Sequence, residues 1–175
     1  MSNNPIILGI DPGTCITGYA LIKESQGEIV PLDFGCIKPP TRFSLHERYL
    51  IIFNALDDLI QKHKPTALAI ENQFVYKNAQ SALKLGMAKG ISMIPALKAG
   101  IKVYEYAPKE AKLAVTGSGS ASKESVQRML KLLLKLSSVP QPEDAADALA
   151  LAICHLKREK NSTFFTKRMD YVRLS

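Results

Sequence analysis

The chain has 175 residues, of which 46% are hydrophobic and 22% charged, and its formal net charge is +7. This length favours one domain with its own core, and three scattered cysteines fit neither a disulfide framework nor a zinc site. No apolar run approaches the ~18 residues of a membrane span, and the N-terminus lacks a signal-peptide pattern, so we expect a cytoplasmic protein with reduced thiols.

The first third of the chain predicts three strands and then a helix. Apolar runs separated by short turns predict antiparallel strands at residues 6–11, 17–23 and 28–37. Apolar residues at helical spacing follow over residues 45–60, after Ser44 and Glu47, which fit a capping box.

The rest of the chain alternates strands with helices. Short apolar runs predict strands at residues 66–70 and 103–106, and the helical crossovers make them parallel to the first strand. Further helices are expected from about residue 78 and over residues 108–115, 122–136 and 142–158, the last opening with a proline and two acids. The pattern predicts an α/β fold with a five-stranded mixed sheet flanked by helices.

We expect one domain over residues 1–158 and a basic, polar tail over residues 159–175. The tail shows no clear periodicity, so it need not be ordered. The stretch "TGSGSAS" at residues 116–122 has the composition of a flexible loop.

The positive charge is concentrated in one segment. Residues 77–136 hold 11 Lys/Arg and only 3 Asp/Glu, whereas the segments before and after them are close to neutral. A phosphate backbone is the natural partner of such a segment. A solvated, lysine-rich surface would have the same composition, so charge alone does not decide between the two.

Four acids are placed where they can converge. Asp11 ends the first predicted strand and Glu71 the fourth, and parallel neighbours would bring both to one rim of the sheet. Asp144 and Asp147 lie three residues apart at the start of an alanine-rich helix, so they share a face. Each also has an ordinary reading, as a turn residue, an exposed strand end or an acid favoured by the helix dipole.

Convergence of these acids would favour bound metal. Like charges raise one another's pKa, and a divalent cation offsets that cost. Oxygen ligands alone indicate Mg²⁺ or Mn²⁺, and two such ions can activate water against a phosphodiester. An acidic metal site beside a basic surface is typical of a nuclease.

Four segments resemble the RuvC family of bacterial Holliday-junction resolvases over about residues 5–156. They are "LGIDPGTCITGYALI", "AIENQFVYKNAQSALKLGMAKG", "YAPKEAKLAVTGSGSASKESVQRML" and "PEDAADALALAICH". The resemblance implies an RNase H-like fold and a homodimer that makes paired, symmetric nicks in four-way DNA junctions during recombination and repair. It also implies 5′-phosphate and 3′-hydroxyl ends, and the branch-migration motor RuvA-RuvB as a partner.

The resemblance further assigns roles to single residues. Asp11, Glu71, Asp144 and Asp147 match the family's catalytic acids, and two Mg²⁺ per subunit are expected, with Mn²⁺ able to substitute.

Basic and aromatic residues are assigned in the same way. Lys112 and Lys123 match lysines that contact DNA near the scissile phosphate and neutralise transition-state charge. Phe74 matches an aromatic that stacks on bases opened at the junction centre; a loop residue folded onto the core is the alternative. Lys84 and Lys89 are also expected to contact DNA; Lys89 stands where the family often has arginine, and it lacks the bidentate fork.

The helix after residue 78 carries small residues at every fourth position, Ala82, Gly86 and Gly90. In the family this helix forms the dimer interface; close packing on the sheet is the alternative. Pro95 is expected to kink or end this helix.

Three rival functions remain at this point. "GIDPGT" also resembles the phosphate loop of sugar kinases and actin-like ATPases, but those proteins need two such domains and a much longer chain. An RNase H-like nuclease acting on RNA or hybrids is the main alternative. A non-catalytic junction-binding protein is a third, and the presence of all four acids argues against it.

Overall fold

The structure, a computed structural model, describes residues 5–72 and 78–173, with side chains as far as residue 161. The strands are β1 (Ile6–Asp11), β2 (Thr17–Ser25), β3 (Glu28–Ile37), β4 (Ala67–Glu71) and β5 (Lys102–Tyr106). The helices are α1 (Leu45–His63), α2 (Ala79–Lys98), α3 (Pro108–Thr116), α4 (Lys123–Leu133) and α5 (Glu143–Arg173).

The five strands form one mixed sheet in the order β3-β2-β1-β4-β5. β1, β2 and β3 pair antiparallel, whereas β4 is parallel to β1 and β5 is parallel to β4. This is the predicted strand pattern. Because β1 and β4 are parallel neighbours with Ile10 opposite Ile70, their final residues, Asp11 and Glu71, end at the same rim.

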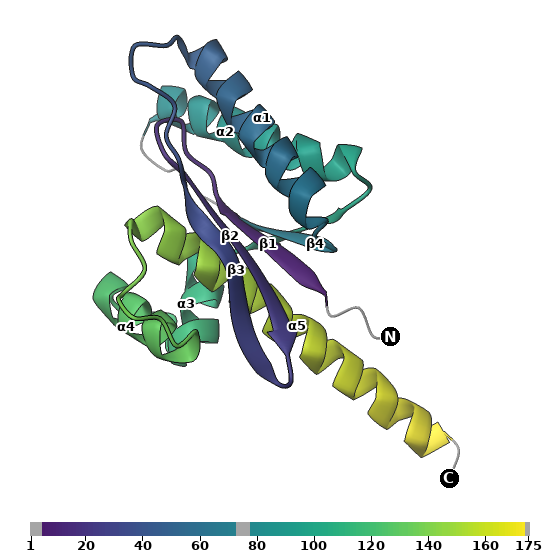
Figure 1. Ribbon diagram of the computed structural model, residues 1–175. Helices are drawn as coiled ribbons and strands as arrows, with labels where there is room; N and C mark the ends of the chain where they lie inside the picture. Colours follow the sequence, from purple (N-terminus) through teal and green to yellow (C-terminus); the bar gives the residue numbers. More distant parts are fainter. Residues whose placement is uncertain (1–4, 73–77, 174–175) are drawn as a thin grey trace.

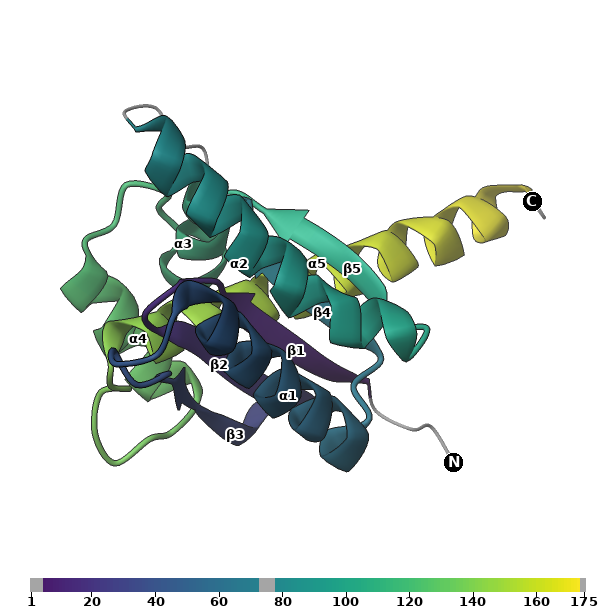
Figure 2. The ribbon, with the colours of Figure 1, turned by 90° about the horizontal axis from the view of Figure 1, so that it is seen from above.

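Helices cover both faces of the sheet, which gives three layers (Figure 1). α1 and α2 lie on one face, and α3, α4 and α5 on the other (Figures 1 and 2). Alternate residues of β1 serve the two cores: Ile7 packs beneath α5, while Leu8 and Ile10 pack beneath α1. Burial on both faces explains why β1 reads as a continuous apolar run.

Helix α1 begins as the sequence predicted. Ser44 Oγ accepts from the Glu47 backbone N–H at 3.3 Å, and the Ser44 N–H donates to Glu47 Oε2 at 2.7 Å, so the capping box is formed. Lys64, in the left-handed region with φ 49°, closes the helix.

Pro95 was expected to kink or end α2; the helix continues past Pro95 to Lys98, so the second of these effects is not found. Proline cannot donate to the carbonyl four residues earlier, but the Pro95 carbonyl still accepts from the Ala99 N–H at 3.1 Å. In the last turn the loss of one hydrogen bond does not stop the helix.

Helix α5 differs from expectation at both ends. It starts at Glu143, so Pro142 precedes the helix, and the Pro142 carbonyl accepts from the Ala145 N–H at 3.0 Å. The helix also does not end at residue 158 but continues to Arg173, so residues 159–173 of the expected tail are a continuation of α5 that projects beyond the sheet (Figure 1). Residues 159–173 contain neither proline nor glycine, and nothing in them breaks a helix.

Within the described chain, no helix has both the length and the apolar character to cross a membrane.

Candidate active site

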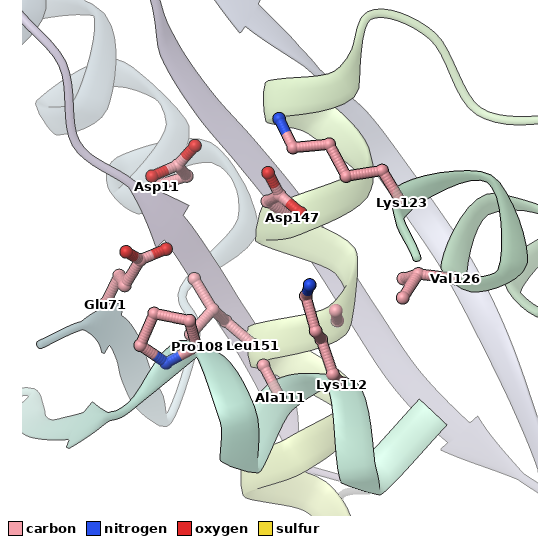
Figure 3. A pocket seen from close by; sticks show the side chains of 10 residues that line it. Asp11, Glu71, Pro108, Ala111, Lys112, Lys123, Val126, Asp147 and Leu151 are labelled. Carbon is pink, nitrogen blue, oxygen red and sulfur yellow. The ribbon is translucent and has the colours of Figure 1, made fainter. Parts of the chain in front are cut away.

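Three of the four predicted acids meet at the rim where β1 and β4 end. Asp11 comes from β1, Glu71 from β4, and Asp147 from the second turn of α5. Together with Lys112 of α3 and Lys123 of α4 they line a cavity of about 320 Å³, around which Figure 3 shows the five charged side chains. The other residues that line the cavity are Pro108, Ala111, Val126, Ala150 and Leu151.

Asp144 lies beside this cavity and is not among the residues that line it. Its side chain is half-buried in the first turn of α5. Its charge still acts on the site, because it raises the pKa of both Asp11 and Asp147. The structure thus brings all four acids to one end of the sheet, with Asp144 at the margin.

Burial and mutual repulsion perturb the carboxyls strongly. Burial, followed by the charges of Glu71, Asp147 and Asp144, raises the pKa of Asp11 from 3.8 to about 8. Burial also raises the pKa of Asp147, against the lowering effect of Lys123. Without a cation, Asp11 therefore keeps its proton at neutral pH, and a divalent ion would take the place of that proton.

The donor set fits a hard divalent cation. Among the described residues that line the cavity, the side chains able to bind a metal are carboxylates, the ligands preferred by Mg²⁺ and Mn²⁺. A cation would also relieve the repulsion that raises the pKa of Asp11. Among the residues described, no three carboxylate, thiol or imidazole groups yet converge closely enough to hold one ion together. The acids line a shared space and do not form a closed ligand shell.

The two predicted lysines lie on the α3–α4 side of the cavity. The Lys112 ammonium donates to the Ala121 carbonyl at 2.9 Å and so joins α3 to the loop before α4. The Lys123 ammonium donates to Glu143 Oε2 at 2.7 Å, and this hydrogen bond raises the pKa of the lysine. Sequence reasoning missed Glu143, although its place directly before Asp144 was a usable signal.

The other predicted DNA contacts lie apart from the cavity or outside the described chain. Lys84 is exposed on α2. Lys89 has its ammonium 2.6 Å from Glu105 Oε2, and its side chain is only 18% exposed. Phe74 falls outside the described residues, so its stacking role stays a prediction.

Gly86 and Gly90 of α2 do not pack closely against other residues of the described chain. A Cβ added at Gly86 or Gly90 would meet no atom within 4 Å, so in the described part of the chain this stripe faces open space. The alternative of close packing within the chain is wrong for these two glycines. Large apolar side chains are exposed on α1 and α2: Leu50 on α1, and Leu83, Met87, Ile94 and Leu97 on α2.

Comparison with known proteins decides the family. The model of the family described as "Crossover junction endodeoxyribonuclease RuvC" matches residues 7–155 of this chain. A crossover junction endodeoxyribonuclease RuvC from Protochlamydia amoebophila is 59% identical over 155 residues, covering 89% of this chain and 92% of the relative. This chain belongs to the RuvC family.

Solved RuvC structures agree with this assignment. Thermus thermophilus RuvC superposes with a TM-score of 0.82 at 33% identity, covering 90% of this chain and 97% of that one. The same protein in complex with a Holliday junction substrate gives a TM-score of 0.85 at 32% identity, covering 91% and 97%. The fold is therefore the predicted RNase H-like α/β fold, which RuvC proteins share.

Proposed function

We propose that this chain is a metal-dependent endonuclease that resolves four-way DNA junctions by paired, symmetric nicks in recombination and repair. The observation that supports it most is the grouping of three acids and two lysines around one cavity in a RuvC family member. A T. thermophilus RuvC with the same fold has been solved with a Holliday junction substrate.

Asp11, Glu71, Asp144 and Asp147 are the residues that would hold Mg²⁺, two ions per subunit, with Mn²⁺ as a substitute. The metal would supply Lewis-acid activation of water and charge stabilisation at the phosphate. The chain's own part is to keep these carboxylates at one rim and to release the Asp11 proton, whose pKa of about 8 lies near neutral. We expect 5′-phosphate and 3′-hydroxyl ends.

The lysines supply positive charge on the opposite side of the cavity. Lys112 and Lys123 reach the site from α3 and α4, so a phosphate between them and the acids would be contacted from both sides (Figure 3). Ammonium groups held beside the scissile phosphate stabilise the extra negative charge of the transition state. The basic segment that contains them binds the rest of the DNA backbone.

A homodimer is the assembly that suits this function. The exposed apolar side chains of α1 and α2, together with the open stripe at Gly86 and Gly90, form a surface that a second copy would cover. A two-fold dimer matches the two-fold symmetry of a four-way junction, so each subunit would cut one strand. The family also makes RuvA-RuvB the expected motor partner.

Substitution of Asp147 by asparagine separates DNA binding from chemistry. The change removes one charge and keeps the shape, so junction affinity in EDTA should hold or rise. Cleavage in Mg²⁺ should fall about a thousandfold, which corresponds to ~4 kcal/mol of transition-state stabilisation. Gel shifts and cleavage time courses on one synthetic four-way junction measure both quantities.

Asp58→Asn is the matched control, because Asp58 is an exposed acid on α1, on the other face of the sheet. Linear duplex and RNA–DNA hybrid of the same sequence complete the comparison. Near-parent cutting by Asp147→Asn would remove this residue from the catalytic site. Preferred cutting of the hybrid by the parent would establish the alternative RNase H-like activity.

A further inference from the structure

Gly18 lies between the strand that ends in Asp11 and the turn of α5 that carries Asp144. In the antiparallel pairing of β1 with β2 it stands directly opposite Asp11. Residues directly opposite in a pair project from the same face of the sheet, so the position of a Gly18 side chain would be on the Asp11 side. That face is the one on which α5 lies, because a Cβ at Gly18 would meet the backbone of α5.

Gly18 also touches the first turn of α5. A Cβ at this position would lie 2.0 Å from the Asp144 carbonyl oxygen and 2.4 Å from the Asp144 carbonyl carbon. Both atoms belong to the backbone, so no change of rotamer could relieve the overlap. The absence of a side chain at Gly18 is what permits the Asp144 backbone to lie so close to the strand that pairs with Asp11.

Gly9 makes the equivalent contact one helical turn later. Its Cβ would lie 2.1 Å from the Ala148 carbonyl oxygen and 3.0 Å from the Ala152 Cβ. α5 therefore rests on β1 and β2 at two points without side chains. The Gly18 contact lies beneath the first turn, which carries Asp144, and the Gly9 contact lies beneath the second turn, which carries Asp147.

We propose that Gly18 is a positioning residue for the metal site: it sets how closely the Asp144 end of α5 approaches Asp11. This inference rests on the proposed metal-dependent function. Real Cβ atoms are not found closer than 3.0 Å to such a neighbour, so Gly18→Ala must move the Asp144 carbonyl away by at least about 1 Å. A displacement of that size is enough to disrupt a constellation that must be held within ~0.5 Å.

The test measures metal binding directly. Mn²⁺ affinity of the intact protein is determined by calorimetry and by electron paramagnetic resonance, without DNA. Gly18→Ala should bind Mn²⁺ at least about tenfold more weakly than the parent, while its junction affinity in EDTA stays unchanged. Leu56→Ala, at a fully buried position of α1 on the opposite face of the sheet, is the control for lost stability alone and should keep the parent's Mn²⁺ affinity.

A longer acid provides a second, independent measurement. Asp144→Glu adds one methylene group, so in the Gly18→Ala background it should regain Mn²⁺ affinity by spanning the wider gap. In the parent background the same change should weaken Mn²⁺ binding, because the spacing there fits aspartate. Asp144→Glu in the parent background keeps the test decisive even if Gly18→Ala does not fold.

The outcomes separate the two proposals. If the parent binds no Mn²⁺, the proposed metal-dependent function fails. If the parent binds Mn²⁺ and Gly18→Ala binds it equally well, only the positioning role of Gly18 is overturned. Parent-like Mn²⁺ binding by Asp144→Glu alone would also overturn it, since the spacing would then not matter.

Discussion

Asp11 links the metal site to the stability of the metal-free protein. Its carboxyl has a pKa of 3.8 when unperturbed and about 8 in the fold. Between these values the folded protein holds a proton that the unfolded chain has already released. The free energy of unfolding of the metal-free protein therefore falls as pH rises from about 4 through 8.

Asp11→Asn should remove this dependence. In EDTA at pH 9 the variant should melt at least about 3 °C above the parent, the shift that ~1 kcal/mol gives in a domain of this size. At pH 5 the difference should shrink, because the parent's carboxyl is then protonated. Calorimetry from pH 5 to 9 measures this, and parallel melting curves for parent and variant would contradict it. Added Mg²⁺ should stabilise the parent at pH 9 and leave the variant nearly unchanged.

At the scale of elements, the two lysines of α2 that were expected to contact DNA lie in different surroundings. Lys89 is paired with Glu105 of β5 and so joins α2 to the edge strand. Lys84 is exposed, with its backbone carbonyl accepting from the Tyr49 hydroxyl at 2.9 Å. Both were expected to contact DNA, but the Lys89 ammonium is held by Glu105, whereas no described residue pairs with the Lys84 ammonium.

These surroundings predict opposite phenotypes. Lys89→Gln should lower the melting temperature, because Glu105 loses a largely buried cation, and it should change junction affinity little. Lys84→Gln should leave melting unchanged and weaken junction binding, with a shallower salt dependence by about one phosphate contact. Thermal melting and binding titrations at several salt concentrations check both. The stabilising role given to Lys89 is wrong if Lys89→Gln alters junction affinity and leaves the melting temperature unchanged.

Most of the elements and the three cavity-lining acids follow from local sequence rules. Asp11 and Glu71 are predictable because strand direction fixes which rim their ends reach, and Ser44 with Glu47 fixes the start of α1. The position of Glu143 directly before Asp144 places it near the site, but its pairing with Lys123 is not predictable in this way, because that pairing depends on how α4 packs against α5. The same is true of Gly18, since a glycine in a strand does not reveal which backbone lies against it.

At the scale of the whole molecule, the two faces of the sheet have different tasks. The face beneath α3, α4 and α5 leads to the cavity, whereas α1 and α2 expose an apolar surface. This division lets a second copy cover α1 and α2 without closing the cavity. The proposed dimer would therefore leave both active sites open to DNA.

Leu83→Glu tests the dimer. Leu83 is 67% exposed on α2, so a charge there should not disturb the fold but should prevent a second copy from packing. Sedimentation should show a monomer, and paired nicking of a junction should be lost. Leu132→Glu is the control, because Leu132 is 70% exposed on α4, on the cavity side of the sheet. A Leu83→Glu protein that remains dimeric would place the interface elsewhere.

In the protein without DNA, the Glu143 carboxylate pairs with Lys123 at the position where the lysine would contact a phosphate. Both side chains are more than half exposed, at 58% and 55%, so the pair contributes only ~0–1 kcal/mol and is easily exchanged. An incoming phosphate would displace the Glu143 carboxylate and pair with Lys123, whose side chain already extends toward the cavity. Arrival of DNA at this point is then a substitution of one anion for another, with little new ordering of the side chain.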